Sequence, residues 1–272
     1  KTKILFIVNP ISGHGHKEYF PLLVNRYIDK TAFDYEIVFT EFKGHARELA
    51  NEGIHRGMEI IVAVGGDGTI NETAHSLIDS DCSLGIIPLG SGNGLARTLK
   101  LPLLPQLAIK NNINKKRISR IDTATVNGVP FVSIAGFGLD AETADAFAKD
   151  GRRGFFTYSK IAIDKYLHSQ PESCRITIDD CKTFVCKPMM VTIANSTQFG
   201  YDARIAPNAL LDDGKLDVCL LHKPELSAAP IVATQLLDGR ISHSPYFRTI
   251  QATKIEISRT ADAPIAFASL TA

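Results

Sequence analysis

The sequence has no long hydrophobic run. Its longest purely apolar stretches, such as Ile4–Val8 and Ile60–Val64, hold about five residues each, whereas a helix that crosses a bilayer needs about 20. We therefore expect no membrane-spanning helix. A secretory signal peptide is not expected either, because the first of these stretches is too short for the apolar region of one and ends at Asn9-Pro10.

The sequence also has no excess of charge. Lys plus Arg number 30 and Asp plus Glu number 29, so the net charge is +1, which argues against a dedicated nucleic-acid-binding protein. None of the five cysteines forms a Cys-x-x-Cys motif, and their odd number is typical of reduced thiols in a cytoplasm. Hydrophobic residues make up 44% and charged residues 22%, which excludes wholesale disorder. We expect a cytoplasmic globular protein whose 272 residues form one large domain or two ordinary ones.

Strands and helices alternate in the first third of the sequence. Short apolar runs predict strands, and apolar residues three or four positions apart predict helices. The expected strands cover residues 4–8, 35–40, 60–64 and 84–87, and the expected helices cover residues 20–28, 46–54 and 71–78. This order is typical of a parallel sheet with helices on its faces.

The pattern changes near residue 120. Residues 123–126 and 129–134 flank Asn127-Gly128, which is a strong signal for a β-hairpin. Further strands are expected at residues 174–179, 183–185, 191–194, 216–221 and 254–258, and helices at residues 158–168 and 229–237. We therefore predict an α/β domain with a parallel sheet at residues 1–121 and a mainly antiparallel β domain with a few helices at residues 122–272.

One glycine-rich stretch directly follows a predicted buried strand. It reads Gly65-Gly66-Asp67-Gly68-Thr69 and precedes a predicted helix. At the carboxyl edge of a parallel sheet, glycines let backbone N–H groups approach a phosphate, and a helix N-terminus adds a favourable partial charge. Asp67 could hold Mg²⁺, and Thr69 and Asn71 offer further hydrogen-bond donors. The alternative is a tight strand-to-helix turn with no chemical role.

Two other glycine-rich turns also follow predicted strands, at residues 9–13 and 88–94. The sequence contains neither a Walker A pattern nor the Gly-x-Gly-x-x-Gly dinucleotide pattern. If the first, third and fourth strands are parallel, all three turns meet at the same edge of the sheet. Together the three turns predict a site for the phosphates of a nucleotide.

The three turns and several later segments resemble the catalytic domain of the diacylglycerol kinase family, which includes bacterial lipid kinases and the sphingosine and ceramide kinases. The matching segments are residues 9–13, 65–72, 88–97, 136–141, 194–195 and 206–218. The Gly-Gly-Asp-Gly-Thr motif alone is shared with NAD kinases and phosphofructokinases, but this set of segments in this order is highly specific. The resemblance implies an N-terminal domain like that of NAD kinase and phosphofructokinase, a lipid-binding second domain, and ATP-dependent transfer of a phosphoryl group to a lipid hydroxyl of the diacylglycerol or long-chain-base type.

The resemblance also implies which residues form the site. Asp67 would be catalytic, and ATP would contact Asn9, Ser12, Thr40, Gly65, Gly66, Asp67, Gly68, Thr69, Ile70, Asn71 and Ser91. A Mg²⁺ ion would bind the carbonyl groups of Leu210 and Lys215 and the carboxylate of Asp213. From the residues alone, Asp212-Asp213-Gly214 before a strand is equally well interpreted as a plain turn.

One element of the family is missing from the sequence. The family's general base is a Glu in an Asp-Gly-Glu motif near the C-terminus, but no Glu follows Glu256, and the closing segment that returns to the first domain is also missing. Either the sequence is incomplete at its end, or the protein lacks the base and is a catalytically inactive nucleotide- or lipid-binding homologue. A third alternative is a kinase of a soluble substrate such as NAD, although Asn71-Glu72 directly after the glycine stretch favours the lipid kinases.

Positive charge gathers locally at Lys110, Lys115, Lys116, Arg117 and Arg120. A lipid kinase must meet a membrane surface, where each cation near anionic lipid contributes about 1 kcal/mol. The alternative is an ordinary solvated run of charge. The expected partners are ATP and a lipid, with peripheral membrane contact and no nucleic acid, and the sequence indicates neither which lipid nor which oligomeric state.

Overall fold

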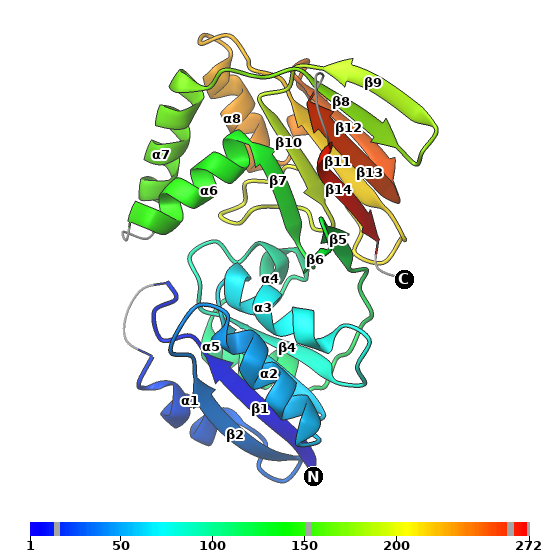
Figure 1. The fold of residues 1–272 in the computed structure, drawn as a ribbon. Coiled ribbons are helices and arrows are strands. Elements are labelled where there is room, and N and C mark those ends of the chain that lie inside the picture. Colours follow the sequence, from blue (N-terminus) through cyan, green and yellow to red (C-terminus); the bar gives the residue numbers. More distant parts are fainter. Residues whose placement is uncertain (14–16, 151–153, 260–263, 271–272) are drawn as a thin grey trace. The chain divides into compact units, whose positions relative to one another are not determined.

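The computed structural model describes residues 1–13, 17–150, 154–259 and 264–270. The chain divides into two compact units, unit 1 at Lys1–Arg120 and unit 2 at Ile121–Ala272 (Figure 1). In the described ranges unit 1 has one sheet and unit 2 has two, and each unit has its own hydrophobic core. No helix of the described ranges combines the length and the hydropathy that crossing a membrane requires.

Unit 1 is built on a four-stranded sheet in which every neighbouring pair of strands is parallel. Its strands lie in the order β2-β1-β3-β4, with bounds β1 (Thr2–Val8), β2 (Phe33–Phe39), β3 (Ile60–Gly65) and β4 (Ser83–Pro88). All six residues of β3 are buried, as expected for a strand that is covered on both faces. The predicted parallel sheet is therefore confirmed.

Helices cover both faces of this sheet. Their bounds are α1 (Phe20–Tyr27), α2 (His45–His55), α3 (Asp67–Leu77), α4 (Gly94–Thr98) and α5 (Pro105–Ala108), and a π-helical turn follows at Ile109–Ile113. Along β1, Phe6 belongs to the core that contains Phe20 of α1, whereas Ile7 belongs to the core that contains Ala50 of α2 and Leu77 of α3. Successive side chains of a strand point to opposite faces, so the apolar run predicted as a buried strand supplies both cores.

The helix that follows the Gly65–Thr69 stretch begins earlier than predicted. The sequence predicted a start near Asn71, but α3 begins at Asp67. The carbonyl group of Gly66 already accepts the N–H of Ile70, with an N···O distance of 3.0 Å. The second half of the glycine stretch is therefore the first turn of a helix and not a loop in front of one.

Unit 2 contains two antiparallel sheets. The first has the order β12-β11-β10-β7 and the second the order β6-β5-β14-β13-β8-β9. Their bounds are β5 (Ala124–Val126), β6 (Val129–Phe131), β7 (Ile134–Gly138), β8 (Cys174–Ile178), β9 (Lys182–Cys186), β10 (Met190–Ala194), β11 (Leu216–Leu221), β12 (Phe247–Ala252), β13 (Lys254–Arg259) and β14 (Pro264–Leu270). The predicted antiparallel β region is confirmed.

The two sheets of unit 2 share one core. Ile176 of β8 and Ile257 of β13 belong to the same buried cluster as Ile193 of β10 and Val218 of β11. A second cluster holds residues from the four-stranded sheet together with Val232 from the helical side. The helices on that side are α6 (Leu139–Asp150), α7 (Phe155–His168) and α8 (Ala229–Asp238), and a short 3₁₀ turn lies at Ile241–His243 (Figure 1).

The predicted hairpin around Asn127-Gly128 is present, but its second strand is shorter than predicted. Both turn residues have positive φ, 49° and 78°, which is the geometry that favours Asn-Gly. The single strand predicted at residues 129–134 is wrong, because β6 ends at Phe131 and β7 starts at Ile134 in the other sheet. The chain changes sheets at residues 132 and 133.

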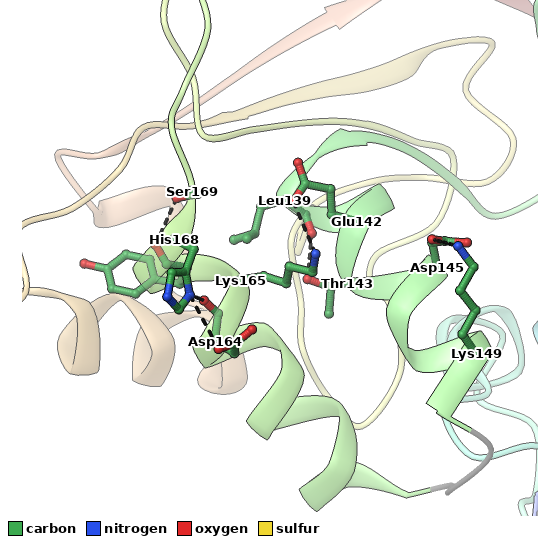
Figure 2. Close-up of polar contacts among 10 residues, drawn as sticks. Leu139, Glu142, Thr143, Asp145, Lys149, Asp164, Lys165, His168 and Ser169 are labelled. Atoms are coloured by element: carbon green, nitrogen blue, oxygen red, sulfur yellow. Dashed lines mark hydrogen bonds and ion pairs between the residues drawn. The ribbon is translucent and has the colours of Figure 1, made fainter.

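Helices α6 and α7 have polar contacts both within each helix and between the two. Lys149 pairs with Asp145 on α6 at 2.6 Å, and the Nδ1 of His168 donates to the carbonyl of Asp164 on α7 at 2.8 Å. Between the two helices, the Lys165 ammonium lies 3.9 Å from the carboxylate of Glu142 (Figure 2). Because both charged groups of this ion pair remain partly exposed to solvent, the pair contributes little to stability.

Candidate functional site

The carboxyl ends of the strands of unit 1 meet at one edge, and the three glycine-rich turns begin there. The N–H of Asn9, at the end of β1, donates to the carbonyl of Val64 in β3 at 2.9 Å. The N–H of Leu89, after β4, donates to the carbonyl of Gly65 in β3 at 2.8 Å. The turns at residues 9–13, 65–69 and 88–94 therefore lie side by side, and we call them the glycine cluster.

The turns of the glycine cluster touch through their backbones. A Cβ atom on Gly90 would lie 2.3 Å from the Cα of Gly66, and a Cβ atom on Gly13 would lie 2.2 Å from the carbonyl oxygen of Leu89. Gly13 also has a positive φ of 60°. Only glycine fits such close backbone approaches. The spacing of these glycines thus follows from packing between turns that are distant in sequence.

Asn9 and Ser12 hold the first turn in shape. The side-chain amide of Asn9 donates to the hydroxyl of Thr69 at 3.0 Å, and its carbonyl oxygen accepts the N–H of Ile11 at 3.1 Å. The hydroxyl of Ser12 donates to the carbonyl of Asn9 at 3.0 Å. Two of the predicted nucleotide contacts therefore connect the first turn internally and join it to the second turn.

Asp67 joins the second turn to the third. It is half-buried in the first turn of α3, and its carboxylate accepts the N–H of Leu95 at 3.3 Å. Burial raises the pKa of Asp67, and hydrogen bonds from the backbone N–H groups of Leu95, Asn93 and Gly94 oppose that rise. The carboxylate thus lies at the N-terminus of α4, where the partial positive charge of a helix end favours an anion.

Gly68 leaves open space at the start of α3. It is exposed, and a Cβ atom placed on it would have no heavy atom within 4 Å. It lies in the first turn of an 11-residue helix, where N–H groups have no acceptor within the helix. An open backbone with such N–H groups is a ready site for a phosphate oxygen.

The remaining residues predicted to contact ATP lie around this edge in different environments. Thr40 is buried directly after β2, and its N–H donates to the carbonyl of Val8 at 2.9 Å. Ile70 is buried in α3, so its side chain belongs to the core. Asn71 lies one position further along α3. The hydroxyl oxygen of Ser91 is buried without a hydrogen-bond partner in the described part of the chain, so it fits the role of a group that bonds to a ligand.

A hydrogen bond joins the loop that follows Thr40 to α3. The sequence alone did not predict this contact. The N–H of Gly44 donates to the carboxylate of Glu72 at 3.1 Å. Within the loop, the rings of Phe42 and His45 stack with centroids 4.4 Å apart. Phe42 remains 54% exposed. The loop therefore carries an accessible aromatic ring between its contact with β1 at Thr40 and its contact with α3 at Gly44.

The residues predicted to bind Mg²⁺ lie on the loop before β11 in unit 2. The carboxylate of Asp213 accepts the N–H of Lys215 at 3.1 Å, and the carboxylate of Asp122 accepts the N–H of Gly214 at 2.8 Å. The loop is also tied to the chain start of unit 2, because the N–H of Asp122 donates to the carbonyl of Leu211 at 2.6 Å. The sequence analysis did not predict that Asp122 contacts this loop, because 92 positions separate Asp122 from Gly214.

The oxygen groups of this loop suit a hard cation. Carboxylates and carbonyls are the donors that Mg²⁺ prefers. Asp213 supplies one carboxylate from this loop, and Asp122 brings a second carboxylate to the loop through its contact with Gly214. Burial raises the pKa of the nearby Asp217, and the charge of Asp213 raises it further. Over the described ranges there is no group of three or more His, Cys, Asp or Glu side chains that could hold a metal, so a cation here would depend on carbonyl and water ligands as well.

The predicted basic run is partly packed against unit 1. The ammonium of Lys110 lies 4.7 Å from the ring centroid of Tyr27, and that of Lys116 lies 4.8 Å from the ring centroid of Phe33. The ammonium of Lys116 also donates to the hydroxyl of Thr2 at 2.7 Å. These two cations therefore have specific partners within the unit, although both residues are exposed.

Comparison with known proteins assigns both units. Residues 3–126 match the diacylglycerol kinase catalytic domain, and residues 133–269 match the YegS C-terminal NAD kinase beta sandwich-like domain. Over 257 residues the chain is 28% identical to a diacylglycerol kinase of Bacillus subtilis strain 168, covering 93% of this chain and 84% of that protein. Over 207 residues it is 33% identical to a probable lipid kinase YegS-like of Yersinia enterocolitica, covering 72% of this chain and 68% of that protein.

Solved structures agree on the fold. The crystal structure of a putative diacylglycerol kinase from Bacillus anthracis superposes with a TM-score of 0.78 at 22% identity, over 99% of this chain and 92% of that one. Similarity to two family domains in succession, together with relatives of the same family along most of the chain, agrees with the motifs of the sequence. The chain therefore belongs to the diacylglycerol kinase family.

Proposed function

We propose that the protein is an ATP-dependent lipid kinase that transfers the γ-phosphoryl group of ATP to a hydroxyl group of a lipid. Unit 1 binds the nucleotide in this proposal, and unit 2 binds the lipid. The observation that carries the proposal is the glycine cluster, in which three backbone turns meet beside an open helix N-terminus at Gly68. Phosphoryl transfer depends mainly on positioning and on neutralising charge, and this arrangement supplies both for a chain of phosphates.

The geometry supports separate roles for the predicted site residues. The N–H groups at the start of α3 and the hydroxyl of Ser91 donate to phosphate oxygens. Asn9, Ser12 and Thr69 keep the turns in register through the hydrogen bonds between and within them. Asp67 brings a negative charge to the edge of the cluster, where Mg²⁺ bound to ATP would supply the neutralising positive charge.

The loop after β2 supports a place for the base of the nucleotide. Thr40 anchors one end of the loop to β1, and Glu72 anchors the other end to α3. Phe42, held flat against His45 between these anchors, offers a ring on which a purine can stack. Stacking of a base on an aromatic side chain contributes about 1–3 kcal/mol. The phosphates in the glycine cluster and the base on Phe42 would then belong to one nucleotide.

A lipid acceptor is supported by the names of the relatives and by the surface of α7. Phe156, Ile163 and Leu167 are 85%, 61% and 53% exposed. Their spacing of seven and four residues places them on one face of the helix. An apolar face of this kind suits contact with a lipid assembly, and it is consistent with a substrate drawn from a membrane surface.

The proposal is tested by incubating the protein with γ-labelled ATP, Mg²⁺ and mixed micelles that contain diacylglycerol, sphingosine, phosphatidylglycerol or ceramide, with NAD as a soluble acceptor. We expect label in at least one lipid and none in NAD. Label in NAD alone would replace the proposal by a soluble-substrate kinase. Binding of ATP without transfer to any acceptor would replace it by a nucleotide-binding homologue without activity.

We also propose that Mg²⁺ binds at the loop of residues 210–215, through the carbonyls of Leu210 and Lys215 and the carboxylate of Asp213. A ligand that binds only the folded state stabilises it, and at about ten times its dissociation constant Mg²⁺ should add about 1.4 kcal/mol. That corresponds to a rise of about 3–6 °C in the melting temperature. We expect this rise in the unchanged protein and its loss in Asp213→Ala.

Thermal unfolding with Mg²⁺ and with a chelator measures this effect. Asp212→Ala is the matched control, because Asp212 is the exposed neighbouring carboxylate. The control should keep the rise in full. Equal shifts in Asp213→Ala and in the unchanged protein would remove Asp213 from the cation site.

A further inference from the structure

Two cysteines face each other across a hairpin of unit 2. Cys174 of β8 lies directly opposite Cys186 of β9, and their sulfur atoms are 3.9 Å apart. Residues opposite each other in an antiparallel pair have Cα atoms about 4.5–5.5 Å apart, which lies within the range of about 4.4–6.8 Å found for disulfides. A pair in this register therefore has a Cα separation that a disulfide can span, and bonding would shorten the S–S distance from 3.9 Å to about 2.05 Å.

The two thiols differ in access. Cys174 is 7% exposed and lies in the core between the two sheets, whereas Cys186 is half-buried on β9, the edge strand of its sheet. Burial, with a smaller contribution from the neighbouring Cys186, raises the pKa of Cys174 to about 12. Burial also raises the pKa of Cys186, but the charge of Arg248, on β12, opposes that rise. Cys186 is thus the thiol that a dissolved reagent reaches first.

The other cysteines have no sulfur partner. Cys82 donates to the carbonyl of Met58 at 2.8 Å, Cys181 donates to the carbonyl of Asp179 at 3.0 Å, and Cys219 is buried. In the described ranges, which include all five cysteines, only Cys174 and Cys186 bring two sulfur atoms together. No Cys-x-x-Cys motif marks this pair in the sequence, because 12 positions separate its members.

We propose that Cys174 and Cys186 form a reversible dithiol–disulfide site whose oxidant is a small-molecule disulfide. In the first step the thiolate of Cys186 attacks one sulfur of that disulfide, which gives a mixed disulfide and releases one small thiol that carries the proton lost by Cys186. In the second step the thiolate of Cys174 attacks the sulfur of Cys186, which forms the cross-strand bond and releases the second small thiol with the proton from Cys174. Two protein thiols are oxidised, and one small disulfide is reduced to two thiols.

The disulfide would link the edge strand β9 to β8 at the end of the hairpin that the turn does not close. The β8–β9 hairpin is closed at one end by its turn, where the N–H of Cys181 donates to the carbonyl of Ile178 at 3.1 Å. The cysteine pair lies at the opposite end of the same hairpin. Edge strands are among the parts of a sheet that open most easily, and β9 carries Phe184 against the core. Oxidation should therefore slow amide hydrogen exchange in β9 by about tenfold or more.

The test uses the full chain and oxidised glutathione as the probe. After incubation, free thiols are alkylated in denaturant without reductant, and the digest is analysed by mass spectrometry. We expect a peptide that links Cys174 to Cys186, three alkylated cysteines in place of five (5 − 2 = 3), and recovery of all five after reduction. Five alkylated cysteines, or a linked peptide that contains Cys181 instead, would overturn the proposal.

Serine variants test the order of the two steps. Cys174→Ser should retain glutathione on Cys186 as a stable mixed disulfide, because the resolving thiol is gone. Cys186→Ser should leave Cys174 unmodified, and Cys181→Ser should leave the link unchanged as the matched control. Stable glutathione on Cys174 in the Cys186→Ser variant would contradict the order. Since the peptide map of the unchanged chain carries the main result, poor folding of a variant would not remove it.

Discussion

Replacing Asp67 with asparagine is expected to reduce phosphoryl transfer by about 10²-fold or more while unit 1 stays folded. The asparagine side chain keeps an oxygen that can accept the N–H of Leu95 at the start of α4. It removes the negative charge that the proposal places beside the phosphates. Kinase assays at saturating ATP, together with circular dichroism, separate the loss of charge from a loss of fold.

Asp67→Ala is the informative comparison. Alanine removes the acceptor at the start of α4 and leaves its N–H groups without the carboxylate, which costs about 1–3 kcal/mol when a buried partner is lost. We expect this variant to be less stable and as inactive as Asp67→Asn. Full activity in Asp67→Asn would show that the charge has no part in transfer.

The same carboxylate gives a pH dependence with a defined sign. Because burial raises the pKa of Asp67 above its ordinary value of 3.8, the folded state binds the proton more tightly than the unfolded state. The contribution of this group to stability is therefore present at low pH and is lost as the pH rises through the raised pKa. Denaturant unfolding across the acidic range should show this decline in the unchanged protein and a smaller one in Asp67→Asn.

Alanine at two glycines of the cluster is expected to have opposite effects on stability. In Gly90→Ala the new methyl group would lie 2.3 Å from the Cα of Gly66 and 3.0 Å from its N. The clash is with backbone, so the second and third turns must separate, at a cost of about 1–3 kcal/mol. In Gly68→Ala the methyl group meets nothing within 4 Å, and alanine within a helix gains about 0.5–1 kcal/mol over glycine.

Both substitutions should weaken nucleotide binding, for different reasons. Gly90→Ala disturbs the shape of the glycine cluster, whereas Gly68→Ala fills the open space in which a phosphate would lie. Calorimetric titration with ATP and denaturant unfolding measure the two effects separately. A Gly68→Ala variant that is more stable and binds ATP with full affinity would show that the space at Gly68 is not used by the phosphates.

The main sheet of unit 1 was predictable because its signals are local. Residues 4–8 and 60–64 are continuous apolar runs, and such runs in a chain that alternates strands and helices leave few arrangements other than a parallel sheet. Once the strands are parallel, the turns that follow them share an edge. The three glycine-rich turns therefore meet because the strands are parallel, and predicting this did not require knowledge of side-chain packing.

What the sequence did not show depends on contacts between distant residues. The start of α3 at Asp67 was missed because helical periodicity of apolar residues begins only later, at Ile70. The contact between Asp122 and the loop of residues 210–215 was not predicted, because only folding brings Asp122 to Gly214. Cys174 and Cys186 lie opposite each other only in the observed register of their hairpin, and the turn geometry sets that register.

A crystal structure of the protein with Mg²⁺ and a non-hydrolysable ATP analogue tests most directly whether the glycine cluster binds the phosphates of a nucleotide. We expect phosphate oxygens within about 3 Å of backbone nitrogens at the start of α3, between the turns of residues 9–13 and 88–94. An analogue bound with its phosphates away from these turns, while the turns keep their present contacts, would contradict this expectation.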